Sequence, residues 1–165
     1  MSGAWRKFPL WAEDKGSVTV EFVVGVPLIL LAFVFAFEFG NLFWMHNIVV
    51  NNVHTAARFL SRAPLAEPFL TRAENIARTG DPDTATGVYA WMEKTCEQGG
   101  ICIDINQNFA AFSAVDFRSA GQVIRIEARV PVATPLFGLM NALSGGNAPE
   151  TITFRVAEEA RYFGG

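Results

Sequence analysis

The sequence predicts an α+β protein in which one long N-terminal helix is packed on a small antiparallel sheet with short helices. Residues 22–37 carry one uncharged apolar run, preceded by Val18 to Val20, which together are long enough for a membrane-spanning helix. An apolar period of three and four continues that run, and segments of alternating apolar and polar residues follow in the C-terminal half. Outside the membrane stretch, the 165 residues leave room for one small soluble domain.

The long helix is expected to cover residues 17–61. Beyond the uncharged run, apolar residues recur at steps of three and four at Leu42, Met45, Val49, Val53, Ala56 and Leu60. This period is typical of an amphipathic helix with one buried stripe, and Pro64 sets its limit by disfavouring helix in the residue before it. Within the membrane part, Gly25 and Pro27 predict a kink, because proline removes one backbone hydrogen bond.

The C-terminal half contains shorter elements. Helix-compatible patterns cover residues 68–78 and 84–94, and the break between them offers Asp83 as a helix cap. Strand patterns cover residues 101–106, 124–130 and 151–156, with a weaker one at 114–117. The sheet is expected to bury one face on the amphipathic half of the long helix, since neither surface is buried alone.

Residues 131–149 read as a loop between the last two strands. The loop contains the apolar string Leu136 to Met140. Such a string either joins the local core or forms a contact surface for a partner or a membrane, and both interpretations are kept.

Charge and cysteine content narrow the function classes. The formal net charge is -3 and no basic block exists, so nucleic acid is not an expected partner. Cys96 and Cys102 lie on either side of Gly99 and Gly100. An even cysteine count on an exported-looking segment predicts one disulfide, and two free thiols in a reducing compartment are the alternative.

The flanks of the apolar run predict its orientation. Arg6, Lys7 and Lys15 precede it, whereas the next basic residues, Arg58 and Arg62, lie well beyond it. This excess places the leader in the cytoplasm and the C-terminal part on the other side of the membrane. A cleavable secretory signal is the alternative, but its apolar core would be shorter and followed closely by a small-x-small cut site.

Glu21 is the anomaly of the apolar segment. A carboxylate at mid-bilayer costs about 2.5 to 3.5 kcal/mol on insertion scales, so it calls for a partner. Cleavage after Gly16 would create an amine on Ser17 that is protonated at neutral pH and can pair with the carboxylate. The amine could belong to the same chain, one turn away, or to a neighbouring one.

No catalytic or metal site is expected, and no cofactor. His46 and His54 are about 12 Å apart along the predicted helix, too far to share one metal. Asp81 to Asp83 resemble a calcium loop only weakly, because Met92 stands where the bidentate glutamate is needed. Glu158 and Glu159 are neighbours in a predicted strand and would point to opposite faces.

The N-terminal motifs resemble those of type IV pilins and pseudopilins. The charged leader, Gly16, Ser17, Glu21 with Phe22, and Pro27 carry this resemblance. The strings Val20-Glu21-Phe22, Pro27-Leu28, Phe37-Glu38-Phe39-Gly40 and Ala56-Ala57-Arg58 are more specifically similar to the TadE-like minor pilins of the tight-adherence (Tad/Flp) pilus system. The resemblance is good over residues 16–62 and looser beyond them.

The resemblance implies a pilin-like fold and a chain divided into a leader (1–16), an N-terminal helix (17–62) and an extracytoplasmic α+β domain (63–165). It implies cleavage by a prepilin peptidase between Gly16 and Ser17, and subunit pairing through Ser17, Glu21 and Phe22, with Glu21 meeting the amine of a neighbouring subunit. The implied role is initiation or tip-complex assembly of a Tad/Flp pilus for surface adhesion.

The partners that the resemblance implies are a prepilin peptidase, other major and minor pilins, the inner-membrane assembly platform and membrane lipid. The implied location is the bacterial inner membrane, in a single pass with the C-terminal domain in the periplasm, with incorporation in the pilus as a further possibility. Two other functions stay open: an unprocessed single-pass protein with an extracytoplasmic ligand-binding or sensory domain, and a pseudopilin of type II secretion.

Overall fold

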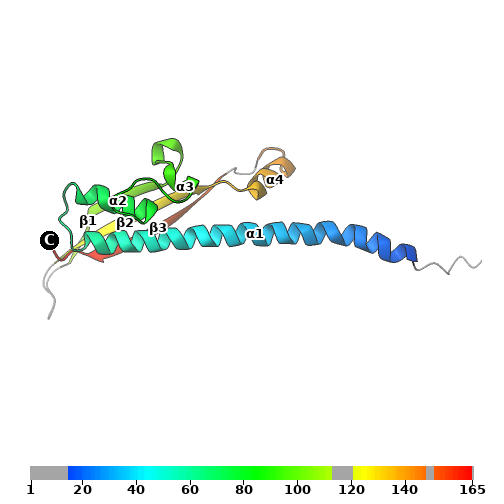
Figure 1. Ribbon diagram of the computed structural model, residues 1–165, viewed down its shortest axis with the longest axis horizontal. Coiled ribbons are helices and arrows are strands. Elements are labelled where there is room, and N and C mark those ends of the chain that lie inside the picture. Colours follow the sequence, from blue (N-terminus) through cyan, green and yellow to red (C-terminus); the bar gives the residue numbers. More distant parts are fainter. Residues whose placement is uncertain (1–14, 113–120, 148–150, 165) are drawn as a thin grey trace, which may run out of the picture. The chain divides into compact units, whose positions relative to one another are not determined.

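The computed structural model describes residues 15–112, 121–147 and 151–164 (Figure 1). In chain order the elements are α1 (Lys15–Leu60), α2 (Phe69–Thr79), α3 (Ala90–Glu93), a 3-10 turn (Cys96–Gln98), β1 (Cys102–Phe112), β2 (Gly121–Val132), α4 (Pro135–Leu143) and β3 (Ile152–Arg161). The chain divides into two compact units, Met1–Gly40 and Asn41–Gly165. A long apolar helix, a three-stranded antiparallel sheet and short helices confirm the predicted α+β fold class.

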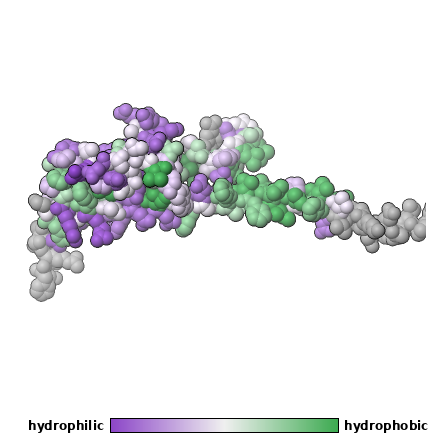
Figure 2. Space-filling model, in the orientation of Figure 1, coloured by the Kyte–Doolittle hydropathy of each residue, from purple (hydrophilic) through white to green (hydrophobic). Residues whose placement is uncertain are grey.

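The N-terminal unit contributes the apolar part of α1. By length and composition, the helix from Thr19 to Leu60 is able to cross a membrane. Large apolar side chains of this unit are exposed, among them Phe22, Leu28 and Phe33, and Figure 2 shows this part of the helix as hydrophobic. The helix assignment continues through Pro27, and the kink at Gly25 and Pro27 stays a prediction.

In the C-terminal unit the sheet has the order β1-β2-β3, and both pairings are antiparallel. The central strand β2 alternates as its sequence predicts. Its buried side chains are Ile124, Ile126, Ala128, Val130 and Val132. The register aligns Ile105 of β1 with Ile126, and Val156 of β3 with Ala128, so the apolar residues of all three strands lie on one face.

The last part of α1 supplies the other side of the core. Its buried stripe is Met45, Val49, Val53, Ala56, Ala57 and Leu60, in one apolar cluster with the buried residues of β2. The predicted stripe is thus confirmed, with Leu42 half-buried at its start and Ala57 added. Helix α1 ends at Leu60, next to the predicted limit.

Three contacts show how β3 runs along α1. The rings of His46 and Phe154 are 5.4 Å apart, His54 Nδ1 lies 3.2 Å from Glu158 Oε1, and the Phe163 amide donates to the Ser61 carbonyl at 2.9 Å. The strand and this part of the helix therefore run in the same direction. The start of β3 and the end of β2 consequently lie at the end of the unit where α1 enters it.

The predicted helix over residues 84–94 is wrong over most of its length. Only Ala90–Glu93 is helical, as α3. Before α3 the chain makes a turn at Thr84, whose Oγ1 accepts a hydrogen bond from the Thr86 amide at 3.0 Å. Asp83 caps no helix. Its amide donates to Asp81 Oδ1 at 2.8 Å, and its carboxylate lies 3.3 Å from Arg72.

The segment predicted as a loop over residues 131–149 contains helix α4. Pro135 stands at its start, where the fixed φ of proline favours a first helical turn. Leu136 is buried, whereas Leu139 is 46% and Met140 49% exposed. Most of this apolar string therefore forms surface in the described part of the chain.

The remaining elements agree closely with expectation. Helix α2 lies within one residue of the predicted 68–78 segment, and Gly80 ends it with a φ of 86°. The sheet strands exceed their predicted lengths, and β1 carries an irregularity between Asn106 and Ala110. The weaker strand predicted at 114–117 lies outside the described residues.

Cys96 and Cys102 are joined in a disulfide, which confirms the pairing. The enclosed turn places Gly99 at a φ of 72°, and a Cβ on Gly100 would meet the Lys94 carbonyl oxygen at 2.1 Å. The Gly100 amide donates to the Thr95 carbonyl at 2.8 Å. The disulfide and the glycines together form a tight turn that leads into Ile101, which is buried in the core.

Removing this disulfide is expected to destabilise the C-terminal unit. A Cys96→Ser/Cys102→Ser chain should lose about 2 kcal/mol of unfolding free energy, the loop-closure entropy of so short a loop. Denaturant unfolding of the full chain in detergent micelles measures the loss. Reduction of the native protein should reproduce it and leave the double variant unchanged. Equal stability of native and variant chains would show that the turn holds without the bond.

The outer face of the sheet carries a charged cluster centred on Glu127. Its carboxylate accepts a hydrogen bond from Arg129 Nε at 2.8 Å and lies 3.4 Å from Arg125. The hydrogen bond from Arg129 holds the pKa of Glu127 below its usual value, with the charges of Arg129, Arg125 and Arg155 adding to the effect. A lowered folded-state pKa stabilises the fold above the unfolded carboxyl pKa, and this contribution is lost as the pH falls through the folded value.

Glu127→Gln is therefore expected to lower the melting temperature at neutral pH and to have little effect at a pH below the folded-state pKa. The effect is modest because Arg129 is 46% exposed and screened by solvent. Melting curves of both chains from about pH 3 to 7 measure it. A difference that stays constant with pH would exclude the charge pair as its cause.

Candidate functional site

Glu21 is an exposed carboxylate on the apolar part of α1. It borders a shallow groove of about 280 Å³ that is also lined by Phe22, Gly25, Val26 and Ile29. Gly25 lies one turn after Glu21, and a Cβ placed there would meet no atom within 4 Å. The missing side chain opens a notch beside the carboxylate. Small residues at such positions allow close approach of a second helix in a membrane.

The surface around this groove is made of large apolar side chains. Phe22 is 69% and Ile29 57% exposed. In water such a continuous apolar surface is unfavourable, so it is suited to lipid or to another apolar helix. Within it, Glu21 is a group that requires a polar partner.

Gly16 and Ser17 lie in the first turn of α1, which begins at Lys15. Ser17 and Glu21 are four residues apart along α1, which is about one helical turn. This spacing leaves both predicted pairings open, within a chain and between chains. Cleavage after Gly16 and the pairing through Ser17, Glu21 and Phe22 stay predictions.

The other polar residues singled out in the sequence have separate structural partners. His46 lies against Phe154, and His54 contacts Glu158. Glu159 lies 3.8 Å from Arg125, on the face opposite to that of Glu158, as the strand alternation predicts. Within the described ranges no group of three His, Cys, Asp or Glu side chains is placed to hold a metal ion.

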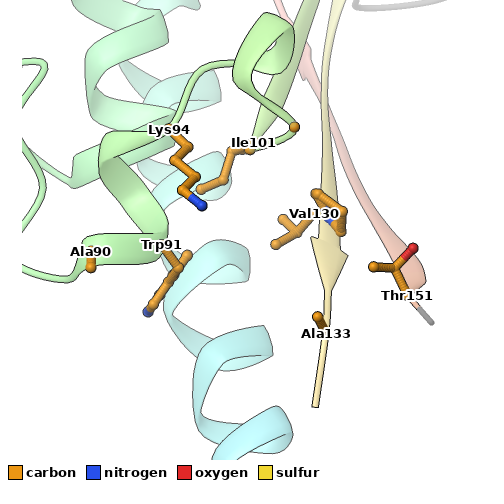
Figure 3. A pocket seen from close by; sticks show the side chains of 10 residues that line it. Ala90, Trp91, Lys94, Ile101, Val130, Ala133 and Thr151 are labelled. Atoms are coloured by element: carbon orange, nitrogen blue, oxygen red, sulfur yellow. The ribbon is translucent and has the colours of Figure 1, made fainter. Parts of the chain in front are cut away.

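The C-terminal unit contains a cavity of about 340 Å³ that no sequence motif predicts (Figure 3). Trp91 and Lys94 come from α3 and its end, Val130 and Ala133 from β2 and the residues after it, and Thr151 stands just before β3. Among the described residues that line it, Lys94 supplies the ionisable group. Because the lining comes from segments far apart in sequence, only the three-dimensional arrangement reveals it.

Residues 16–58 match the family model described as TadE-like protein. Among curated proteins, the probable non-inhibitory serpin-Z5 of Arabidopsis thaliana is 31% identical over 91 residues, which cover 54% of this chain and 21% of that protein. The chain thus spans about a fifth of that protein's length, and a fragment of this size carries no argument about function. No solved structure matches the chain significantly.

The family match covers the whole of the candidate site. It begins at Gly16, includes Glu21 with its groove, and ends at Arg58 within the buried stripe of α1. It agrees with the resemblance that the N-terminal motifs indicate. From Gly16 to Arg58, this chain carries the sequence signature of a TadE-like protein.

Proposed function

We propose that the protein is a minor pilin of a Tad/Flp pilus, anchored in the inner membrane by α1 and cleaved by a prepilin peptidase between Gly16 and Ser17. The observation that carries the proposal is a carboxylate, Glu21, in an exposed apolar helix inside a TadE-like match. TadE-like proteins are linked to Tad pilus systems. The role proposed for this chain is structural, without catalysis.

The proposed assembly contact is formed by the groove beside Glu21. A neighbouring pilin helix would approach at the Gly25 notch, where little side-chain volume separates the two backbones. Its new N-terminal amine would then meet Glu21, and the two charges would neutralise each other in the membrane. The contact sets the register of two subunits because only one axial position brings amine and carboxylate together.

The C-terminal unit is proposed to lie on the periplasmic side. The excess of basic residues before the apolar segment favours this orientation. The Cys96–Cys102 disulfide also favours it, since disulfides persist in oxidising compartments. In this position the unit would contact other pilus components during initiation or at the tip, and the assembly platform would engage the anchor in the membrane.

The test is a deletion strain that is complemented with the native gene or with a Glu21→Gln gene. The proposal expects the deletion to abolish Tad pili and surface attachment, the native gene to restore both, and the Glu21→Gln gene to fail. Pili and attachment that are unchanged in the deletion strain would overturn the assignment.

The cavity lined by Trp91 and Lys94 is the observation that favours the second candidate, an unprocessed membrane protein with a ligand-binding domain. That function requires a mature chain that still carries residues 1–16. It also requires a small molecule that raises the melting temperature of the C-terminal unit, with the rise removed by filling the cavity through Ala133→Phe.

A further inference from the structure

Helix α4 carries an apolar stripe that runs out of the core. Leu136, Leu139, Met140 and Leu143 follow one another at helical spacing. Leu136 is 8% exposed and anchors the first turn, whereas Leu143 at the last turn is 79% exposed. Figure 2 shows hydrophobic atoms gathered over this helix. Among the described residues, the core therefore covers only the first turn of this stripe and leaves its last turn exposed.

This stripe lies at one particular end of the C-terminal unit. Helix α4 connects the end of β2 to the start of β3. The contact between His46 and Phe154 shows that this is the end of the sheet at which α1 enters the unit. The opposite end is marked by the bond between Ser61 and Phe163. Along the chain, α1 reaches this entry directly from its apolar segment. If α1 spans a membrane, the α4 end of the unit is the one next to it.

An aromatic cluster stands at the same end. The rings of Trp44 and Tyr89 lie 4.8 Å apart, and Tyr89 stacks on Trp91 with ring centroids 6.1 Å apart. Trp91 also lines the cavity that Ala133 lines just before α4. Trp44 is 45% exposed, and Val88 beside the cluster is 84% exposed. Tryptophan and tyrosine with exposed rings are enriched at membrane–water interfaces.

The segment that carries the stripe has no charge of its own. Residues 130–149 contain no charged side chain, so the stripe can enter an apolar layer without desolvating an ion, whereas Lys94 at the aromatic cluster lies in the cavity beside Trp91. We propose that α4 and the Trp44–Tyr89–Trp91 cluster form a second membrane contact, in which the exposed turn of α4 lies in the interfacial layer of the bilayer. The inference rests on the membrane anchoring in the proposed function. It would fix the C-terminal unit against the membrane surface until the subunit is extracted into a fibre.

The experiment places one fluorophore at a time on the full chain in vesicles of phosphatidylcholine and phosphatidylglycerol. The labelled sites are Leu143→Cys on α4, Arg62→Cys at the opposite end of the unit, and Leu30→Cys in the apolar segment. Labelling without reductant leaves the native disulfide intact. Brominated lipids, which quench only fluorophores that touch acyl chains, should cause loss of emission at positions 30 and 143 and none at position 62.

The three labelled sites distinguish failure of the second membrane contact from failure of the membrane anchor. Quenching at position 30 but not at 143 would overturn the second contact and leave the anchor intact, whereas no quenching at position 30 would overturn the anchor itself. Adding Leu139→Glu and Met140→Glu to the chain labelled at 143 should abolish its quenching, and both positions tolerate charge because they are half exposed. Blue-shifted emission at 143 that ignores brominated lipid would show that another protein subunit covers α4.

Discussion

Replacing Gly16 by leucine is expected to leave the leader on the chain. A branched side chain at this position would obstruct the approach of the scissile peptide to the protease and restrict the backbone, both of which glycine permits. In a strain with active prepilin peptidase, the native chain should accumulate with 149 residues, which is the 165-residue sequence without its first 16. Gly16→Leu should accumulate at the full 165 residues, and intact mass measurement distinguishes the two.

Ser17→Ala is the matched control, since it changes the other side of the same bond and keeps a small residue there. It should be cleaved like the native chain. Cleavage of Gly16→Leu at the native position would show that the glycine does not define the site.

Glu21→Gln is expected to leave cleavage intact and to weaken subunit association. The substitution keeps the shape of the side chain and removes its charge, so a partner amine would stay unpaired in the membrane. Breaking a buried ion pair from one side costs about 3 to 5 kcal/mol, and each 1.4 kcal/mol is about tenfold in an equilibrium constant. Recovery of co-purified pilins from detergent extracts should therefore fall at least about tenfold.

The matched control for this variant is Val24→Ala, an exposed position on the same segment that does not line the groove. It should leave recovery near the native level. If Glu21 pairs with the amine of its own chain, Glu21→Gln would instead leave co-purification unchanged, and the intermolecular pairing would be wrong.

The long helix and the sheet could be predicted because their signals are local and periodic. The stripe from Met45 to Leu60 has the period of a helix, and the burial of β2 alternates as in a strand, so each pattern predicts one type of secondary structure. The disulfide could be predicted because two cysteines flank a turn rich in glycine. The site signal was equally local, since Glu21 is out of place in an apolar segment.

The features that the sequence did not predict depend on side-chain bonds that compete with helix formation, or on contacts between distant parts of the chain. The pattern over 84–94 fits a helix, but the Thr84 hydroxyl accepts a hydrogen bond from the Thr86 amide instead and closes a turn. Gly87 also packs directly against Met92, where a Cβ on residue 87 would lie 2.2 Å from that side chain. The apolar string of α4 left two interpretations open, local core or contact surface, and only the position of Leu136 in the core decides which of its turns is covered. The groove beside Glu21 could not be predicted, because the sequence does not show that the space beside Gly25 is open.

In the proposed function, cleavage of the leader comes before subunit assembly. Before cleavage, Glu21 has no amine to meet and association is disfavoured. After cleavage, each chain carries one carboxylate and one amine, so it can pair with a subunit on either side. The proposal therefore makes processing a condition for assembly.

The intact mass of the native protein, extracted from membranes of a strain with active peptidase, tests this account most directly. The account predicts a chain that begins at Ser17 and has lost residues 1–16, with the Cys96–Cys102 disulfide retained. A membrane-extracted chain that still carries the leader in that strain would contradict it.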